Sequence, residues 1–275
     1  MADARPIGIF DSGVGGLTVV RAVLDLLPHE PVVYFGDTAR SPYGPRPLEE
    51  IQGFAKEIAA YLIQRDVKAL VVACNSVEVA AIEDLTERSG IPVVGVIDPG
   101  VRAALRATRN SKIGVIGTEA TIASGAYERA VRELNGAELM SAACPAFVPF
   151  VESGDTTSDE LLAAARGYLK PLIEADVDTL ILGCTHYPLL SGLLQVVMGP
   201  EVVLISSAEE TAKDVYARLG TEMLLADEAH PVHEFLCSGD PAAFLALASR
   251  FLGPEAAEVR ATSVQPLTLG EGSWS

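Results

Sequence analysis

Short apolar runs alternate along the chain with longer segments of helical periodicity, and this alternation constrains the fold more than any other feature. Seven such runs are rich in β-branched residues and predict buried parallel strands at residues 6–10, 31–37, 69–74, 91–97, 112–117, 179–184 and 201–206. Between them lie stretches such as residues 48–65, whose apolar residues recur at helical spacing. We therefore expect an α/β fold with mostly parallel sheets covered by helices on both faces.

The chain also repeats itself. The segment VKALVVACNS at residues 67–76 resembles VDTLILGCTH at residues 177–186, which aligns Cys74 with Cys184, and the next strands keep the same offset. Upstream, PIGIFDS resembles KIGVIGT at a slightly shorter offset, so that Ser12 corresponds to Thr118. Three matched strands in one order predict two similar α/β domains related by a pseudo-two-fold axis, with a site in the cleft between them.

The repeat suggests where the domains divide. We expect a first domain at residues 1–98 that carries Cys74 and is completed by residues 209–275. The second domain, residues 99–208, carries Cys184. The helical segment AEETAKDVYARL begins at residue 208, beyond the second repeat, and we expect it to pack back on the rest of the chain.

Bulk properties exclude several classes of protein. A chain of 275 residues can bury two small cores without metal or disulfide support. The net charge of −17 disfavours binding to nucleic acid or to an anionic membrane. The start, MADARPIGIF, lacks the pattern of a signal peptide and no apolar run is long enough to span a bilayer, so we expect a cytoplasmic protein with reduced cysteines. No C-x-x-C pair occurs, and no metal is predicted.

Two equivalent thiols that face one cleft suit a particular reaction. Ligands of open α/β sheets bind beyond the carboxyl ends of the strands, where Cys74 and Cys184 both stand. Racemisation at an α-carbon needs a base on one face and an acid on the other, and the two groups exchange roles when the reaction reverses. Cys144 and Cys237 have no counterpart in the repeat and are expected to be buried apolar residues.

Two other motifs leave alternatives open. The stretch FDSGVGG gives a tight turn before a helix that could hold a carboxylate, and together with Asp37 it suggests a dinucleotide fingerprint, whose third glycine would fall at Thr18. His186 beside Cys184 would also suit a cysteine–histidine hydrolase, which would leave Cys74 without a role.

Several long motifs resemble those of the glutamate racemase family over nearly the whole chain. They are GIFDSGVGGLTV, YFGDTARSPYGPR, VVACNS, GVIGTEATI, CPAFVPFVESG, LGCTHYPLL and SSAEETA. The resemblance implies the two-domain aspartate/glutamate racemase fold and the interconversion of L- and D-glutamate without pyridoxal phosphate, metal or other cofactor, which supplies D-glutamate for peptidoglycan. Because homo-oligomers are common among soluble proteins, we also expect a homodimer.

The resemblance also implies roles for individual residues. The two catalytic cysteines map onto Cys74 and Cys184, assisted by Asp11 on the first side and by Glu152 and His186 on the second. Substrate contacts fall on Asp11, Ser12, Tyr43, Gly44, Asn75, Ser76, Thr118, Thr121, Thr185 and His186. The chain departs from the family at Ser76, where threonine is common, and at Glu78, which would disfavour an anionic substrate unless it faces outward.

Other activities compete with this interpretation. An aspartate or hydantoin racemase of the same fold is one alternative. Aspartate is one methylene shorter than glutamate, and a pocket discriminates one methylene by only ~1–3 kcal/mol. A single-thiol decarboxylase of the fold would not need both cysteines. A non-enzymatic nucleotide-binding module would explain the glycine turn and Asp37, but not the matched thiols.

Overall fold

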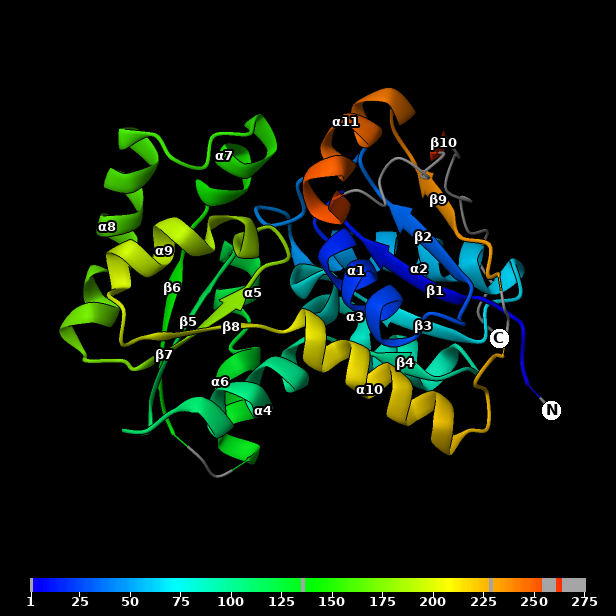
Figure 1. The fold of residues 1–275 in the computed structure, drawn as a ribbon, viewed down its shortest axis with the longest axis horizontal. Coiled ribbons are helices and arrows are strands. Elements are labelled where there is room, and N and C mark those ends of the chain that lie inside the picture. Colours follow the sequence, from blue (N-terminus) through cyan, green and yellow to red (C-terminus); the bar gives the residue numbers. More distant parts are fainter. Residues whose placement is uncertain (1, 135–136, 228–229, 254–260, 264–275) are drawn as a thin grey trace.

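Two parallel sheets organise the computed structural model, which describes residues 2–134, 137–227, 230–253 and 261–263 (Figure 1). The first sheet has the strand order β10-β9-β2-β1-β3-β4, and the second has the order β6-β5-β7-β8. Every strand pair is parallel, which confirms the predicted fold class.

The strands of the first sheet are β1 (Ile7–Asp11), β2 (Val32–Gly36), β3 (Ala69–Val72), β4 (Val93–Val94), β9 (Glu234–Cys237) and β10 (Ala261–Ser263). Helices α2 (Leu48–Gln64) and α3 (Asn75–Arg88) cover one face through a cluster that includes Phe10, Leu70 and Val72. The other face packs against α1 (Leu17–Leu26), α10 (Ala208–Thr221) and α11 (Pro241–Leu252). Helix α10, which the sequence places beyond the second repeat, lies along α1.

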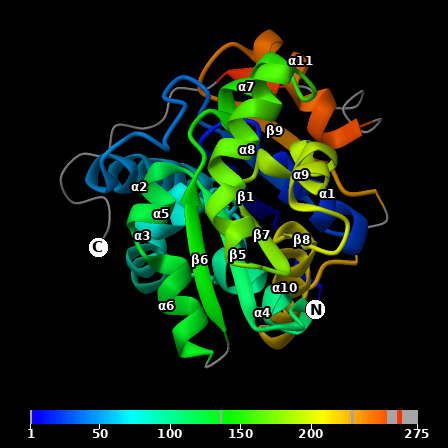
Figure 2. The same ribbon diagram turned by 90° about the vertical axis from the view of Figure 1, so that its left-hand side faces the viewer.

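The strands of the second sheet are β5 (Lys112–Gly117), β6 (Glu138–Ala143), β7 (Thr179–Gly183) and β8 (Val203–Ser206). On one face lie α4 (Ile97–Ala107) and α6 (Ala126–Glu133), and on the other α8 (Asp159–Glu174) and α9 (Ser191–Met198) (Figure 2). Shorter elements near the site are α5 (Glu119–Ala123), α7 (Phe147–Ser153) and the 3-10 helix η1 (Tyr187–Leu190).

The sequence repeat is visible in the register of the two sheets. Ile7 pairs with Ala69 in the first sheet, and Ile113 pairs with Thr179 in the second. Both sheets share the same central order, so β1 and β3 have β5 and β7 as their counterparts. The division of the chain at residues 98 and 208 stays a prediction; of the expected first domain, residue 1 and residues 228–229, 254–260 and 264–275 lie outside the described residues.

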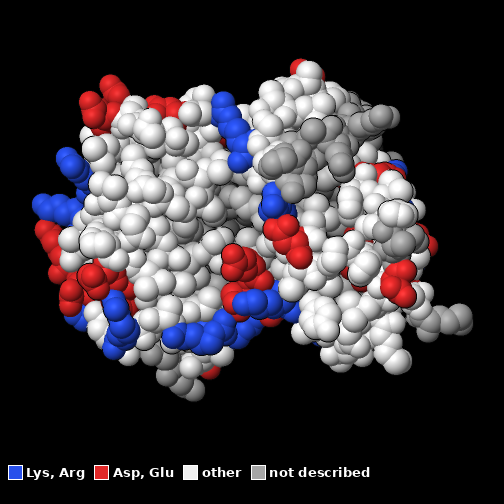
Figure 3. All heavy atoms as spheres, in the orientation of Figure 1, with Lys and Arg blue, Asp and Glu red and all other residues white. Residues whose placement is uncertain are grey.

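We call the sheet that contains β1, with its helices, the first half, and the sheet that contains β5, with its helices, the second half. Charged side chains mark one junction between these two halves. Arg102 on α4 pairs with Asp214 on α10, and Arg106 pairs with Glu210 at 2.5 Å. Figure 3 shows acidic and basic side chains gathered low on this face, where α4 and α10 meet.

Glu78 also lies at this junction, and it does not face outward. It is buried, and one of its carboxylate oxygens accepts main-chain N–H groups of Val96 and Ile97 at 2.5 and 3.0 Å. These groups belong to the first turn of α4, where a helix dipole favours a carboxylate. Glu78 therefore caps α4 instead of opposing a ligand, and burial raises its pKa to about 8.

Candidate active site

Both repeated cysteines stand just beyond the carboxyl end of a central strand. Cys74 follows β3 and is the N-cap residue of α3, while Cys184 follows β7 directly and precedes η1. Both are 7 % exposed, and both line one small cavity between the two sheets. The structure thus brings together two thiols that are 110 positions apart in the chain.

The cavity between the thiols has a volume of about 20 Å³, which is room for about one water molecule. The cavity as it stands is smaller than an amino acid. Ten predicted site residues line the cavity: Ser12, Tyr43, Gly44, Cys74, Asn75, Ser76, Thr118, Cys184, Thr185 and His186. Asp11, Thr121 and Glu152 lie behind this lining and contact it.

On the first side, the Cys74 thiol donates a long hydrogen bond to Ser12 Oγ at 3.6 Å. Burial raises the pKa of Cys74 to about 12, and the negative charge of Asp11 acts in the same direction. Burial also raises the pKa of Asp11, although the charge of His186 and the Gly13 N–H oppose this shift. Cys74 is therefore a protonated thiol at neutral pH and can serve as an acid.

On the second side, Cys184 belongs to a chain of three residues. Its sulfur lies 3.9 Å from His186 Nδ1, and His186 Nε2 lies 3.2 Å from Glu152 Oε1 on α7. Burial alone would lower the pKa of His186, but the hydrogen bonds to Cys184 and Glu152 outweigh it and raise that pKa to about 10. His186 is therefore a cation that lies against the Cys184 sulfur.

The last turn of α11 covers this pair from the first half. The Phe251 ring packs edge-on against the His186 ring with centroids 5.7 Å apart. Arg250 Nη1 donates to the main-chain oxygens of Val151 and Glu152 at the end of α7, at 3.3 and 3.4 Å. His186 is therefore shielded by a helix that belongs to the other half.

Polar contacts join the two halves around the cavity. Thr185 Oγ1 donates to Asp11 Oδ2 at 3.2 Å, and the Ser76 and Thr118 hydroxyls lie 2.9 Å apart. The Thr121 hydroxyl is 3.0 Å from that of Thr118 and extends this cluster. Ser76 thus keeps the hydroxyl contact expected of a threonine at this position.

Gly15 and Gly44 allow the main chain of the first half to approach the second. A Cβ atom at Gly15 would lie 2.3 Å from Thr185 Oγ1 and 2.5 Å from His186 Nδ1. A Cβ atom at Gly44 would lie 2.9 Å from that of Thr118, and the Gly44 oxygen accepts the N–H of Ala120 at 3.1 Å. Only glycine fits these two contacts without displacing the opposite wall.

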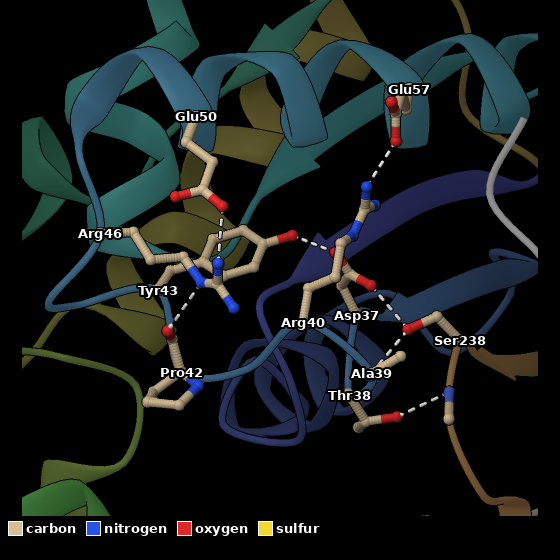
Figure 4. A network of polar contacts seen from close by, with 11 residues as sticks. Asp37, Thr38, Ala39, Arg40, Pro42, Tyr43, Arg46, Glu50, Glu57 and Ser238 are labelled. Carbon is tan, nitrogen blue, oxygen red and sulfur yellow. Dashed lines mark hydrogen bonds and ion pairs between the residues drawn. The ribbon is translucent and has the colours of Figure 1, made fainter. Parts of the chain in front are cut away.

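Tyr43 lines the cavity, but its hydroxyl points away from it. The hydroxyl donates to the buried carboxylate of Asp37, which also accepts from Ser238 and Arg40 (Figure 4). Within the described residues, the main-chain N–H groups of Tyr43 and Gly44 donate no hydrogen bond. These two groups are suited to an anionic ligand.

The same contacts weaken the nucleotide-binding alternative. Asp37 is fully buried and each of its carboxylate oxygens already accepts a side-chain donor, so the side chain does not reach a ribose hydroxyl in the cavity. In the part of the chain that the structure describes, no three His, Cys, Asp or Glu side chains form a group that could hold a metal ion. Likewise, no helix of the described residues is long and apolar enough to cross a membrane.

Strand-end position does not distinguish the two pairs of cysteines. Cys144 follows β6 and Cys237 ends β9, so they too stand at the ends of strands. Neither β6 nor β9 was expected. The separating feature is the cavity, which Cys74 and Cys184 line and the other two do not.

Sequence reasoning missed some lining residues. Ser41, Pro42 and Val148 also face the cavity. The first two lie within the motif YFGDTARSPYGPR and the third within CPAFVPFVESG, so the motifs contained them. Arg250 and Phe251 carry no sequence signal, because an ordinary amphipathic helix explains both.

Comparisons with known proteins agree with this geometry. The family model Asp/Glu/Hydantoin racemase matches residues 17–215. A glutamate racemase from Corynebacterium diphtheriae is 53 % identical over 92 % of this chain and 96 % of its own length. The crystal structure of a glutamate racemase isoform from Bacillus anthracis superimposes with a TM-score of 0.90 at 44 % identity, covering 95 % of this chain and 97 % of that one.

A second solved structure holds a ligand. The glutamate racemase from Francisella tularensis, described as a complex with D-glutamate, has a TM-score of 0.89 at 35 % identity and covers 96 % of this chain and 98 % of its own. Two aspartate racemase structures, at 17 % and 16 % identity, share the fold alone.

Proposed function

The chain belongs to the glutamate racemases of the Asp/Glu/Hydantoin racemase family, and on this premise we propose that it interconverts L- and D-glutamate through Cys74 and Cys184. D-glutamate made in this way supplies peptidoglycan synthesis. The observation that carries the proposal is the pair of thiols that line one cavity from two equivalent strands.

The different surroundings of the two thiols support a starting state for the reaction. His186, whose pKa is raised, lies against the Cys184 sulfur, whereas burial and Asp11 raise the pKa of Cys74 and keep it protonated. Cys184 then removes the α-proton of L-glutamate, and the Cys74 thiol donates its proton to the opposite face of the carbanion. The products are D-glutamate, a Cys184 thiol and a Cys74 thiolate, so the reverse reaction begins with Cys74 as the base.

Glu152 acts through His186 in this scheme. Its carboxylate accepts from Nε2 and so leaves Nδ1 directed at the sulfur. Asp11 has a comparable position on the other side, where it holds the turn at Gly13 and the Thr185 hydroxyl. We therefore propose Glu152 and Asp11 as residues that position and charge the site.

The polar lining supports an amino acid with two carboxylates as the substrate. The main-chain N–H groups of Tyr43 and Gly44 suit one carboxylate, and the hydroxyl cluster of Ser76, Thr118 and Thr121 suits polar groups on the other side of the cavity. The N-terminus of α3 adds a partial positive charge beside Cys74.

Incubation with one enantiomer tests the function. The purified protein with L-glutamate and no added cofactor should lose optical activity until the enantiomers are equal, before and after dialysis against a chelator and treatment with hydroxylamine. L-aspartate under the same conditions should react at least about tenfold more slowly, as expected from one methylene. Faster turnover of aspartate would favour the aspartate racemase alternative.

The homodimer stays a prediction, which light scattering of the protein in solution tests.

A further inference from the structure

Asp37 follows β2 and is fully buried, yet the proposed proton transfer does not use it. We propose that Asp37 is a positioning residue that holds the turn of residues 41–44 in its substrate-binding geometry and ties this turn to the C-terminal segment. The proposal rests on the proposed function, since it concerns the same substrate site.

The first contact of Asp37 is with the turn itself. Its Oδ2 accepts the Tyr43 hydroxyl, and burial together with the negative charge of Asp37 raises the pKa of that hydroxyl above its usual range, so the phenol stays a neutral donor. Tyr43 is 1 % exposed and cannot take another orientation without leaving its packing. Through this bond, Asp37 holds Tyr43 and the neighbouring Gly44 in place, and both residues line the cavity.

The second contact is with the chain beyond β9. Ser238 Oγ donates to Asp37 Oδ1 at 2.6 Å and accepts the main-chain N–H of Ala39 at 2.9 Å. Beside it, the Gly239 N–H donates to Thr38 Oγ1 at 3.0 Å (Figure 4). A segment that is about 200 residues away in the sequence therefore closes around the loop after β2 and gives Asp37 a second donor.

The third contact neutralises the buried carboxylate. Arg40 Nε donates to Asp37 Oδ2 at 2.6 Å, and its Nη1 pairs with Glu57 on α2. The Arg40 guanidinium also lies over the Phe54 ring at 4.0 Å, and that ring packs against Tyr43 with centroids 5.3 Å apart. Asp37 thus stands at the centre of a network in which each of its carboxylate oxygens has a donor, although the buried Nη2 of Arg40 has no partner.

The second half has no such carboxylate. Gly36 pairs with Asp11 at the end of β1, and Ala143 pairs with Gly117 at the end of β5, so Cys144 occupies the place of Asp37 in the other sheet. The network is therefore not a requirement of the fold. It belongs to the side of the site that carries Cys74, where the turn of residues 41–44 has no histidine or glutamate chain to support it.

The test compares Asp37→Asn, Tyr43→Phe and the double variant with a control, Glu50→Gln. Asparagine keeps the shape of the side chain, but its amide nitrogen is a donor. It would face one of the donors that now reach the carboxylate, and that hydrogen bond would be lost. We expect each single variant to raise KM for glutamate about tenfold, the value of one lost hydrogen bond to a charged group, and to change kcat less than about threefold. The KM of the double variant should not exceed that of the single variant with the higher KM, because both changes break the same contact.

Glu50 pairs with Arg46 at 2.6 Å on the exposed side of the same turn, so its replacement should change KM less than about twofold. If Asp37→Asn does not fold, Ser238→Ala removes the second donor and retains the carboxylate, and it should raise KM about threefold. An unchanged KM with a lower melting temperature would show a purely structural role and overturn the proposal. A 100-fold loss of kcat at unchanged KM would make Asp37 a proton-transfer group and would also overturn it. Failure of the wild-type protein to racemise glutamate would instead refute the proposed function.

Discussion

Replacement of Gly15 by alanine tests whether the contact between the two halves sets the catalytic geometry. The added Cβ would lie 2.3 Å from Thr185 Oγ1 and 2.7 Å from His186 Cε1, whereas ordinary contact begins at 3.4 Å. The opposite wall must therefore move by about 1.1 Å, and a misplacement of about 1 Å costs on the order of 10²-fold in rate. We expect kcat/KM for racemisation to fall about 100-fold in Gly15→Ala.

The matched control is Gly53→Ala. Gly53 lies within α2, and a Cβ atom there meets nothing within 4 Å, so this variant should keep full activity and gain about 0.5–1 kcal/mol of stability. Circular dichroism of the reaction mixture measures racemase activity, and unfolding in urea measures stability. If Gly15→Ala retains wild-type kcat/KM, the close approach of Gly15 to His186 is not needed for turnover and the reasoning fails. If both variants lose activity equally, the effect is not specific to the interface.

Two further predictions concern buried groups outside the proton-transfer path. The raised pKa of Glu78, about 8 in the folded protein against 4.5 for an ordinary glutamate, means that the folded state retains a proton which the unfolded chain has released. The stability that this gives is full below about pH 4.5 and is lost as the pH rises through about 8, so Glu78→Gln should flatten that decline in urea unfolding; an unchanged slope would contradict it. Cys144→Ala and Cys237→Ala should each cost about 1 kcal/mol of stability and leave kcat nearly intact, and a 100-fold loss of turnover in either would mean that it belongs to the site.

Continuous apolar runs predicted seven of the strands, and the central ones stood out most clearly. β1, β5 and β7 are almost wholly buried, so a continuous apolar run marked each of them. The edge strand β6 was missed because its sequence ELMSAA is half-exposed and mixes polar with apolar residues. The run at residues 91–97 was expected to form a whole strand, but only β4 at residues 93–94 pairs, because Ile97 already begins α4.

The repeat predicted the pair of thiols, because equivalent strands place equivalent residues at the same edge of each sheet. The repeat could not predict which residues from distant parts of the chain also lie at this edge of the first sheet. Asp37 was considered as a ribose ligand, and only the fold shows that Ser238 and Tyr43 occupy its carboxylate. The cover of His186 by Phe251 was equally hidden, since 65 positions and a different sheet separate the two residues.

Exchange of the α-proton in heavy water tests the two-thiol mechanism most directly. Each thiol should reach one face of the α-carbon, so Cys184→Ala and Cys74→Ala should both abolish racemisation. The Cys184→Ala variant retains Cys74 and should exchange deuterium into D-glutamate with little exchange into L-glutamate, and Cys74→Ala should show the opposite preference. Nuclear magnetic resonance of the α-proton measures both rates, whose ratio is the informative quantity. Equal exchange of both enantiomers in both variants would show that one base serves both faces and would contradict the assignment of one thiol to each.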